Sequence, residues 1–256
     1  MHHDPPSIFP RTDDMTANGA SSSDCCTALR RRVLAFVAEP AVAEEDGLVL
    51  ATRTRARESL SVVAEALQRY RSDELSLSYN GGKDCLVLLI LILACLPAAP
   101  EPLQAIYIAP PDPFPEVEEF VALSAGTYRL DLTRYALPMR EALEAYRADR
   151  PNVKAVFMGT RRTDPHSEFL TPFSPTDGDW PRFMRVNPVL DWDYPEIWAF
   201  IRHLDIPFCS LYNRGFTSLG GMGNTRPNPA LALDGKTFRP AYELARTDEE
   251  RLGRDR

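Results

Sequence analysis

The chain has 256 residues, of which 44% are hydrophobic and 25% charged, and its 29 basic and 36 acidic side chains give a formal net charge of −7. These fractions are ordinary for a globular protein, so a wholly disordered or collagen-like chain is excluded. The acidic balance argues against a duplex nucleic-acid binder, which needs a basic face.

The N-terminal stretch is rich in Pro and Ser and holds almost no large apolar side chains, so we expect a disordered tail over 1–27 and one domain over 28–256. This stretch contains no apolar h-region, so we expect no secretory signal there. The longest apolar run, Leu86–Leu96, is shorter than the roughly 18 residues that indicate a membrane span. Five cysteines without C-x-x-C spacing are typical of free thiols in a reducing compartment, which favours a cytoplasmic protein.

Hydrophobic periodicity predicts helices over 27–37, 51–70, 83–96, 115–124, 137–148, 194–204 and 241–252. Alternating apolar residues predict strands over 75–79, 103–108, 128–132 and 153–158. Strands that alternate with helices indicate right-handed βαβ units. We therefore expect an α/β protein with a Rossmann-like parallel sheet and helices on both faces.

The sharpest motif is S-Y-N-G-G-K-D-C over residues 78–85, which joins the first expected strand to the apolar helix. In an open parallel sheet, ligands bind beyond the carboxyl ends of the strands. Gly81 and Gly82 let the backbone approach an anion, the helix N-terminus adds partial positive charge, and Lys83 adds a full charge. The motif therefore predicts a phosphate cradle.

The motif has two other interpretations. The Walker pattern G-x-x-x-x-G-K-[ST] is not matched, because Asp84 follows Lys83 and no second glycine stands at the required spacing. A plain Asn-Gly-Gly turn, in which Asp84 only stabilises the first turn of the helix, remains open.

The motif resembles the PP-loop of the adenine-nucleotide α-hydrolases, and more closely its variant in the eukaryotic, fungal-type FAD synthases of the phosphoadenosine-phosphosulfate (PAPS) reductase-like group. The general PP-loop is S-G-G-x-D-[ST], whereas here Asn80 precedes the glycines and Cys85 takes the final position, as in the FAD-synthase form. The resemblance covers about residues 50–254. It implies a fold of the PAPS reductase type, with a PP-loop core at about 50–165 and a flavin-pocket and C-terminal segment at about 166–256.

A second motif, G-T-R-R-T-D-P over residues 159–165, follows the fourth expected strand. Arg161 and Arg162 offer planar donors that suit a phosphate or a stacked ring. Asp164, held extended by the following proline, is able to accept from a ring N–H or a hydroxyl. A surface loop with solvated arginines is the alternative. The motif is similar to the flavin-recognition loop of the same synthases, which implies that Gly159, Arg161, Arg162 and Asp164 lie at the flavin.

Five further blocks resemble the FAD-synthase pattern in the same order, at residues 172–177, 180–188, 190–194, 209–220 and 227–231. In that family they shape the isoalloxazine pocket. Trp180, Phe183 and Trp192 are able to stack on a flat ring, and we take Trp192 as a binding residue. Such aromatics are more often part of a core, and we expect this for Trp198.

The last motif is E-R-L-G-R over residues 250–254 in the closing helix, where Arg251 and Arg254 share one face. The resemblance implies that these arginines fold over the phosphates. A charged, fraying end of the chain is the alternative.

Taken together, the resemblance implies an FMN adenylyltransferase that makes FAD and pyrophosphate from FMN and ATP, with no side-chain nucleophile. Its small-molecule partners are then ATP and FMN, and we expect a monomer without nucleic-acid or membrane partners. Mg²⁺ is expected to bridge phosphate oxygens, with Asp84 as a secondary candidate ligand. The resemblance assigns catalysis to Asn80, Asp84, Arg251 and Arg254. The nucleotide-binding residues it implies are Ser78, Tyr79, Asn80, Gly81, Gly82, Lys83, Asp84 and Ile108.

The sequence leaves two alternative functions open. A thiol-dependent PAPS or adenylylsulfate reductase needs a reactive cysteine near the C-terminus, and the last cysteine here is Cys209. A non-catalytic nucleotide-binding module would carry the same binding residues, so only an assay separates it from an enzyme.

Overall fold

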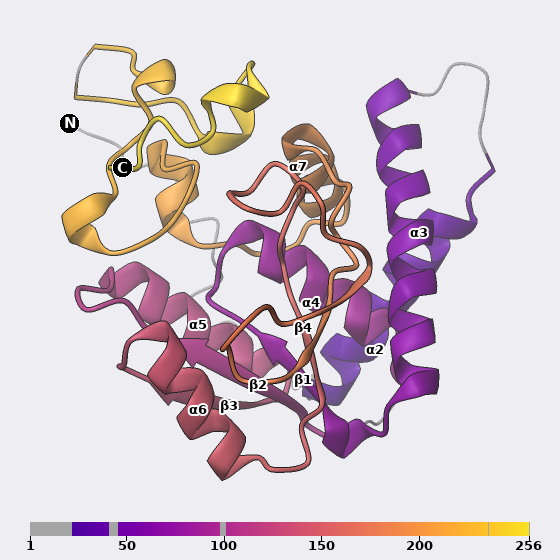
Figure 1. Cartoon of the computed structure of the whole chain (residues 1–256). Helices are drawn as coiled ribbons and strands as arrows, with labels where there is room; N and C mark the ends of the chain where they lie inside the picture. The colour runs from indigo at the N-terminus through magenta and orange to yellow at the C-terminus, as the bar shows by residue number, and fades with distance from the viewer. Residues whose placement is uncertain (1–21, 41–45, 98–100, 235, 256) are drawn as a thin grey trace.

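The computed structural model describes residues 22–40, 46–97, 101–234 and 236–255 (Figure 1). The α-helices are α2 (Ser22–Ala38), α3 (Gly47–Arg69), α4 (Lys83–Cys95), α5 (Pro115–Thr127), α6 (Met139–Asp149) and α7 (Tyr194–His203). The strands are β1 (Leu75–Ser78), β2 (Leu103–Ile108), β3 (Leu130–Tyr135), β4 (Ala155–Phe157), β5 (Phe173–Pro175) and β6 (Met184–Val186). Short 3₁₀ turns occupy Ser72–Glu74, Ser210–Arg214, Met222–Asn224, Pro229–Leu231, Ala241–Glu243 and Thr247–Glu249.

Within the described residues the strands form one six-stranded sheet in the order β3-β2-β1-β4-β6-β5. Neighbouring strands run parallel except β5, which pairs antiparallel with β6 at the edge. The chain leaves β1 toward β2 on one side and later returns to β4 on the other. The direction of strand order therefore reverses between β1 and β4, which is where an open α/β sheet binds ligands.

Side chains alternate between the two faces of the sheet, and each face is covered. In β2, Ala105 and Tyr107 belong to the main core with α4, whereas Ile106 packs in a second cluster with Tyr146 of α6. Helix α4 contacts α2, α3 and α7 as well as the sheet side, so its residues from Leu86 to Ala94 are all buried. A helix enclosed on every side has to be apolar all round, which explains the apolar run in the sequence. The expected α/β fold with helices on both faces is confirmed.

Several expected boundaries shift in the structure. Helix α2 already begins at Ser22, so residues 22–27 are helical rather than part of a tail, while residues 1–21 lie outside the described residues. Helix α5 continues to Thr127, and Arg129 adopts a left-handed backbone (φ 55°), so β3 begins two residues later than expected. The stretch 171–188, expected to lack periodic structure, contains the short strands β5 and β6.

The expected closing helix over 241–252 is wrong. The structure has two 3₁₀ turns there, separated by residues 244–246, of which Leu244 and Arg246 have an extended backbone. Two carbonyls of this segment accept hydrogen bonds from distant side chains, at Glu249 from Asn228 and at Glu250 from Thr217. Tertiary hydrogen bonds thus replace the i to i−4 bonds that a helix would need.

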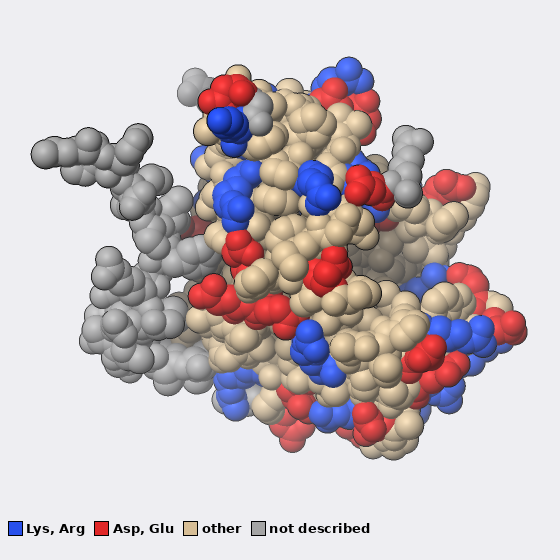
Figure 2. Space-filling model, turned by 90° about the vertical axis from the view of Figure 1, so that its left-hand side faces the viewer, with Lys and Arg blue, Asp and Glu red and all other residues tan. Residues whose placement is uncertain are grey.

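No helix in the described part of the chain combines the length and apolarity needed to cross a bilayer. Figure 2 shows acidic side chains grouped across the middle of one face, with basic side chains above and below them. That face is therefore not the continuous basic field that a duplex nucleic acid requires.

Candidate active site

The turn between β1 and α4 is set by a glycine. Gly81 has φ +71°, and a Cβ atom there would lie 2.9 Å from Cγ2 of Val121 in α5. An L-residue is therefore disfavoured both by its backbone and by lack of space. Gly82 then takes the N-cap position of α4, which directs the helix N-terminus toward the carboxyl end of β1.

Two amides of this turn donate to internal acceptors. The Gly82 N–H donates to Oδ1 of Asn80 at 2.9 Å, and the Lys83 N–H donates to the buried hydroxyl of Tyr212 at 2.8 Å. The Tyr212 acceptor is buried, whereas the Asn80 acceptor is exposed, so an anion is able to replace only Asn80. The exposed Asn80 side chain is free to exchange with such an anion, because no other part of the turn holds it in place. Tyr212 belongs to the 209–220 block, and its role was not foreseen.

The other residues predicted to bind the nucleotide, Ser78, Tyr79 and Ile108, lie at or just after the ends of β1 and β2. Ser78 ends β1 and is half-buried, while Tyr79 is 1% exposed and donates its hydroxyl to Oγ of Ser124. Ile108 ends the neighbouring β2 and is half-buried in the α6-side cluster. Ser78 and Ile108 therefore lie at the expected edge of the sheet, whereas Tyr79 packs in the core.

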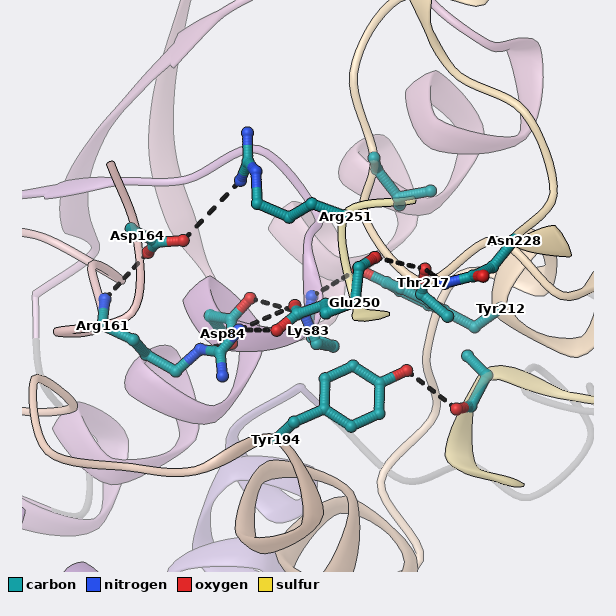
Figure 3. A network of polar contacts seen from close by, with 12 residues as sticks. Lys83, Asp84, Arg161, Asp164, Tyr194, Tyr212, Thr217, Asn228, Glu250 and Arg251 are labelled. Atoms are coloured by element: carbon teal, nitrogen blue, oxygen red, sulfur yellow. Dashed lines mark hydrogen bonds and ion pairs between the residues drawn. The ribbon is translucent and has the colours of Figure 1, made fainter. Parts of the chain in front are cut away.

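Four charged side chains form a buried cluster beneath the turn (Figure 3). Lys83 Nζ lies 2.9 Å from Asp84 Oδ2 and 2.5 Å from Glu250 Oε1. Arg161 places Nε 2.7 Å from Asp84 Oδ1 and NH2 2.5 Å from Glu250 Oε2. Two cations and two anions thus alternate in a ring that joins α4, the loop after β4 and the C-terminal segment.

Electrostatics favour the charged forms of Asp84 and Arg161. Burial opposes charge on Asp84, but Lys83 and Arg161 outweigh it and hold the pKa of Asp84 below its ordinary value. Burial likewise opposes charge on Arg161, yet Asp84 and Glu250 raise the pKa of its guanidinium. Lys83 and Arg161, each 2% exposed, therefore have their charge neutralised inside the protein. We expected Lys83 to present its charge to a phosphate, but in the structure the ammonium group forms ion pairs with Asp84 and Glu250.

The same contacts bear on Asp84 as a metal ligand. Each of its carboxylate oxygens already faces a cation, Lys83 or Arg161. Among the described residues, no group of three or more His, Cys, Asp and Glu side chains is arranged to hold a metal ion. The described side chains therefore do not form a resident Mg²⁺ site by themselves, and the surroundings of Asp84 do not support its assignment to a metal.

The loop after β4 packs directly against the start of α4. A Cβ atom on Gly159 would lie 2.7 Å from Sγ and 2.8 Å from the backbone nitrogen of Cys85. The glycine therefore allows the two loops to touch, which brings the two sequence motifs together at one place. Burial raises the pKa of the Cys85 thiol to about 12, so this cysteine stays protonated at neutral pH.

Asp164 lies at the open side of this loop. Its Oδ2 accepts from the Arg161 N–H at 2.9 Å, and its Oδ1 is 3.7 Å from NH1 of Arg251 (Figure 3). Burial raises the pKa of the Asp164 carboxyl, although its side chain is 30% exposed. A carboxylate held at the mouth of the site, with one oxygen exposed toward Arg251, suits recognition of a polar ligand group.

Arg162 points away from Asp164 and shapes a neighbouring loop. Its Nε is 2.6 Å from Oδ1 of Asp191, and its NH1 donates to the carbonyls of Glu168 and Leu170. The guanidinium of Arg162 therefore holds residues 168–170 in place. Its hydrogen-bond donors are largely taken by these partners, which leaves few for a flavin.

The C-terminal segment is attached to the site from two sides. Thr217 donates to the Glu250 carbonyl at 2.6 Å, Asn228 donates to Thr217 and to the Glu249 carbonyl, and Arg254 NH1 donates to the Leu219 carbonyl at 2.7 Å. Arg251, with a 48% exposed side chain, is left facing the open site. The structure thus brings Arg251 to Asp164 and Arg254 to the Leu219 loop, from an irregular segment rather than one face of a helix.

Trp192 is not available to a flavin. Its side chain is 2% exposed, donates Nε1–H to Oγ of Ser59 at 2.8 Å and packs edge-on against Phe200. Trp198 is buried as expected, whereas Trp180 is 43% exposed. Nothing in the local sequence distinguishes these indoles, because their exposure depends on α3 and α7 packing over the sheet.

Sequence reasoning missed the residues that assemble the site rather than line it: Tyr212, Thr217, Asn228 and Glu250. All four are buried and polar. Three of them lie in the blocks at 209–220 and 227–231, whose polar residues inside Pro- and Gly-rich sequence were the available signal. Glu250 directly precedes Arg251 but was treated only as part of a charged helix.

Comparison with known proteins gives a consistent result. The chain matches the family described as the phosphoadenosine phosphosulfate reductase domain over residues 74–148 and 133–227. It is 41% identical over 205 residues to a probable FAD synthase of Schizosaccharomyces pombe, covering 77% of each chain. It is 39% identical to a probable FAD synthase of Caenorhabditis elegans, of which it spans 40% of the length. Among solved structures, it resembles Candida glabrata FMN adenylyltransferase in complex with FMN and the ATP analog AMPCPP, with a TM-score of 0.84, 27% identity, and coverage of 92% of this chain and 97% of that one.

Proposed function

This chain belongs to the FAD synthases of the phosphoadenosine phosphosulfate reductase domain family, and we propose that it is an FMN adenylyltransferase that converts FMN and ATP into FAD and pyrophosphate. The observation that carries the proposal is the contact between Gly159 and Cys85 at the reversal point of the sheet. It joins an anion cradle after β1 to a polar loop after β4, so that two ligands meet at one edge.

The nucleotide side of the proposed site is the start of α4. The amides of residues 80–82 and the positive end of the helix dipole bind the β- and γ-phosphates, while the Lys83 N–H, expected from the sequence to join them, stays bonded to Tyr212. Where a phosphate oxygen approaches, it exchanges with the exposed Asn80 Oδ1 as the acceptor of the Gly82 N–H. Ser78 and Ile108, at the ends of adjacent strands, border the rest of the nucleotide.

The flavin side is the loop over residues 159–164. Asp164 accepts from polar groups of FMN with the oxygen that faces the open site, while Arg161 acts from below by donating its backbone N–H to the other oxygen. Arg162 contributes by fixing the adjoining loop at 168–170. Trp180 is an exposed aromatic that is able to stack on the ring system, a role that Trp192 is too buried to fill.

The reaction is a direct transfer. An oxygen of the FMN phosphate attacks the α-phosphorus of ATP, the bond from this phosphorus to the bridging oxygen of pyrophosphate breaks, and pyrophosphate leaves with its electron pair. Positioning and charge neutralisation are the main contributions of the protein in such a reaction. Arg251 faces the site and stabilises the charge that develops on the phosphates, and Arg254 supports it from the Leu219 loop.

Other expectations from the sequence stay predictions. A divalent cation, if it enters, is carried by phosphate oxygens, since the described side chains do not form a site for it. A monomer in the cytoplasm, without nucleic-acid partners, also remains to be tested. A thiol-dependent reductase is disfavoured because burial raises the pKa of Cys209 to about 11, which leaves little thiolate at neutral pH.

The proposal is tested by incubating the purified protein with FMN, ATP and MgCl₂ and separating the flavins by chromatography. We expect FAD to form in step with released pyrophosphate. Riboflavin in place of FMN is the matched control, since it lacks the attacking phosphate and should give no dinucleotide. A protein that binds both ligands and forms no FAD would instead be a binding module.

A further inference from the structure

Glu250 is the one acidic side chain of the C-terminal segment that enters the charged cluster seen in Figure 3. Its side chain is 11% exposed, and its two carboxylate oxygens lie 2.5 Å from Lys83 Nζ and 2.5 Å from Arg161 NH2. It therefore contacts both loops of the proposed site at once, one through α4 and one through the segment after β4.

The backbone of Glu250 is held as firmly as its side chain. Its carbonyl accepts from Thr217 Oγ1 at 2.6 Å, and Thr217 in turn accepts from Asn228. Among the described residues, the side chain of the next residue, Arg251, has one ion-pair contact, a long one of 3.7 Å with Asp164, and both side chains are partly exposed. An ion pair of that kind is too weak to fix a long side chain. The position of Arg251 is therefore set mainly by the preceding residue, Glu250.

We propose that Glu250 is a positioning residue for adenylyl transfer: by anchoring the C-terminal segment to Lys83 and Arg161, it holds Arg251 over the reacting phosphates. This inference rests on the proposed function. We assign Glu250 no contact with the substrates, because its two carboxylate oxygens are paired with Lys83 and Arg161.

A purely structural role and a positioning role predict different kinetics. If Glu250 acts through Arg251, its loss lowers kcat and matters little once Arg251 is gone. If Glu250 only stabilises the fold, its loss reduces the fraction of folded enzyme and the penalties of the two substitutions multiply. A double-mutant cycle separates the two cases.

The test uses the full-length chain with Glu250→Gln, Arg251→Ala and the double variant, assayed for FAD formation on protein shown by its thermal transition to be folded. The matched control is Asp248→Asn, which removes a carboxylate of the same segment that is 66% exposed and paired with Arg246. Glu250→Asp is carried through the same cycle, because it keeps the buried cluster neutral and folds even where the glutamine variant does not.

We expect Glu250→Gln or Glu250→Asp to lower kcat by about 10- to 100-fold, with KM values for ATP and FMN within about threefold of wild type. In the Arg251→Ala background the same change should lower kcat by less than about threefold. Asp248→Asn should match its parent in both backgrounds. Wild-type kcat in the Glu250 variants, or losses that multiply, would overturn the inference while leaving the proposed function intact. A wild-type enzyme that makes no FAD would instead reject the proposed function.

Discussion

Glu250 and Lys83 are 167 positions apart in the sequence, yet their side chains meet at 2.5 Å in a buried ion pair. The pair ties the end of the chain to the first turn of α4. Removing one partner of a buried pair leaves an uncompensated charge, which typically destabilises a protein by about 3–5 kcal/mol. The proposed site is therefore also a point where three parts of the fold are joined.

Gly81→Ala should weaken both the fold and ATP binding. The new side chain meets a left-handed backbone and Val121, so we expect the free energy of unfolding to fall by about 1–2 kcal/mol. Gly126→Ala in α5 is the control, since its Cβ meets nothing within 4 Å and alanine favours a helix by about 0.5–1 kcal/mol. Urea unfolding and ATP titration measure both effects, and similar behaviour of the two variants would contradict the assigned turn.

Tyr212→Phe should destabilise the protein without changing its shape. The substitution removes the acceptor of the Lys83 N–H and leaves a buried donor without a partner, at a cost of about 1–3 kcal/mol. Tyr242→Phe is the control, because the ring of Tyr242 packs under Arg202 and is kept. Equal unfolding free energies for the two variants would show that the Tyr212 hydroxyl does not cap α4.

Asp164→Asn should raise the melting temperature at neutral pH. Burial raises the pKa of Asp164 in the folded state, so the folded protein binds this proton more tightly than the unfolded chain. The stability lost to the buried charge is absent below about pH 4, grows as the pH rises through the raised pKa, and is complete near pH 7. The gain in melting temperature should shrink as the pH is lowered toward 4, and a gain that does not depend on pH would contradict the assigned cause.

Asp164→Ala should affect the two substrates unequally. The carboxylate faces the proposed flavin side, so FMN binding should weaken by about 10-fold or more while ATP binding changes by less than about threefold. Fluorescence titration with FMN and calorimetry with ATP measure the two dissociation constants. An equal loss for both ligands would remove Asp164 from the flavin side.

Arg251→Ala should act on catalysis rather than on stability. The side chain is 48% exposed and its contact with Asp164 is long, so unfolding should change little. We expect kcat to fall by about 10- to 1,000-fold if Arg251 neutralises charge in the transition state. Arg246→Ala is the control, since Arg246 lies in the same segment but pairs with Asp248 and Glu249. A wild-type kcat for Arg251→Ala would contradict its role.

The elements that could be predicted from the sequence are those whose pattern is local. Strand β1 and helix α4 are buried almost throughout, their apolar residues are contiguous or closely spaced in the sequence, and both elements lie where expected. The structure of the closing segment, residues 241–252, could not be predicted in this way. Its charged residues match a helix, but Asn228 and Thr217 take up its carbonyls, and no local pattern contains that information.

In the proposed site, too, the local features could be predicted from the sequence and the long-range contacts could not. The cradle at 78–85 and the loop at 159–165 follow from their glycines and their places after strands. The roles of Lys83 and Arg161 in those loops could not be predicted. In the sequence each is a basic residue beside a glycine-containing turn, but in the structure Asp84 and Glu250 neutralise both charges. A partner 89 positions distant from Arg161 is fixed by the fold alone.

The central claim is that the α-phosphoryl group of ATP, together with its adenosine, is transferred to FMN. The most direct measurement follows the label from ATP carrying ³²P at either the α or the γ position during incubation with FMN. Transfer of the adenylyl group predicts that α label appears in FAD and γ label in pyrophosphate. Label from the γ position in a flavin product, or α label that stays in ATP, would contradict the account.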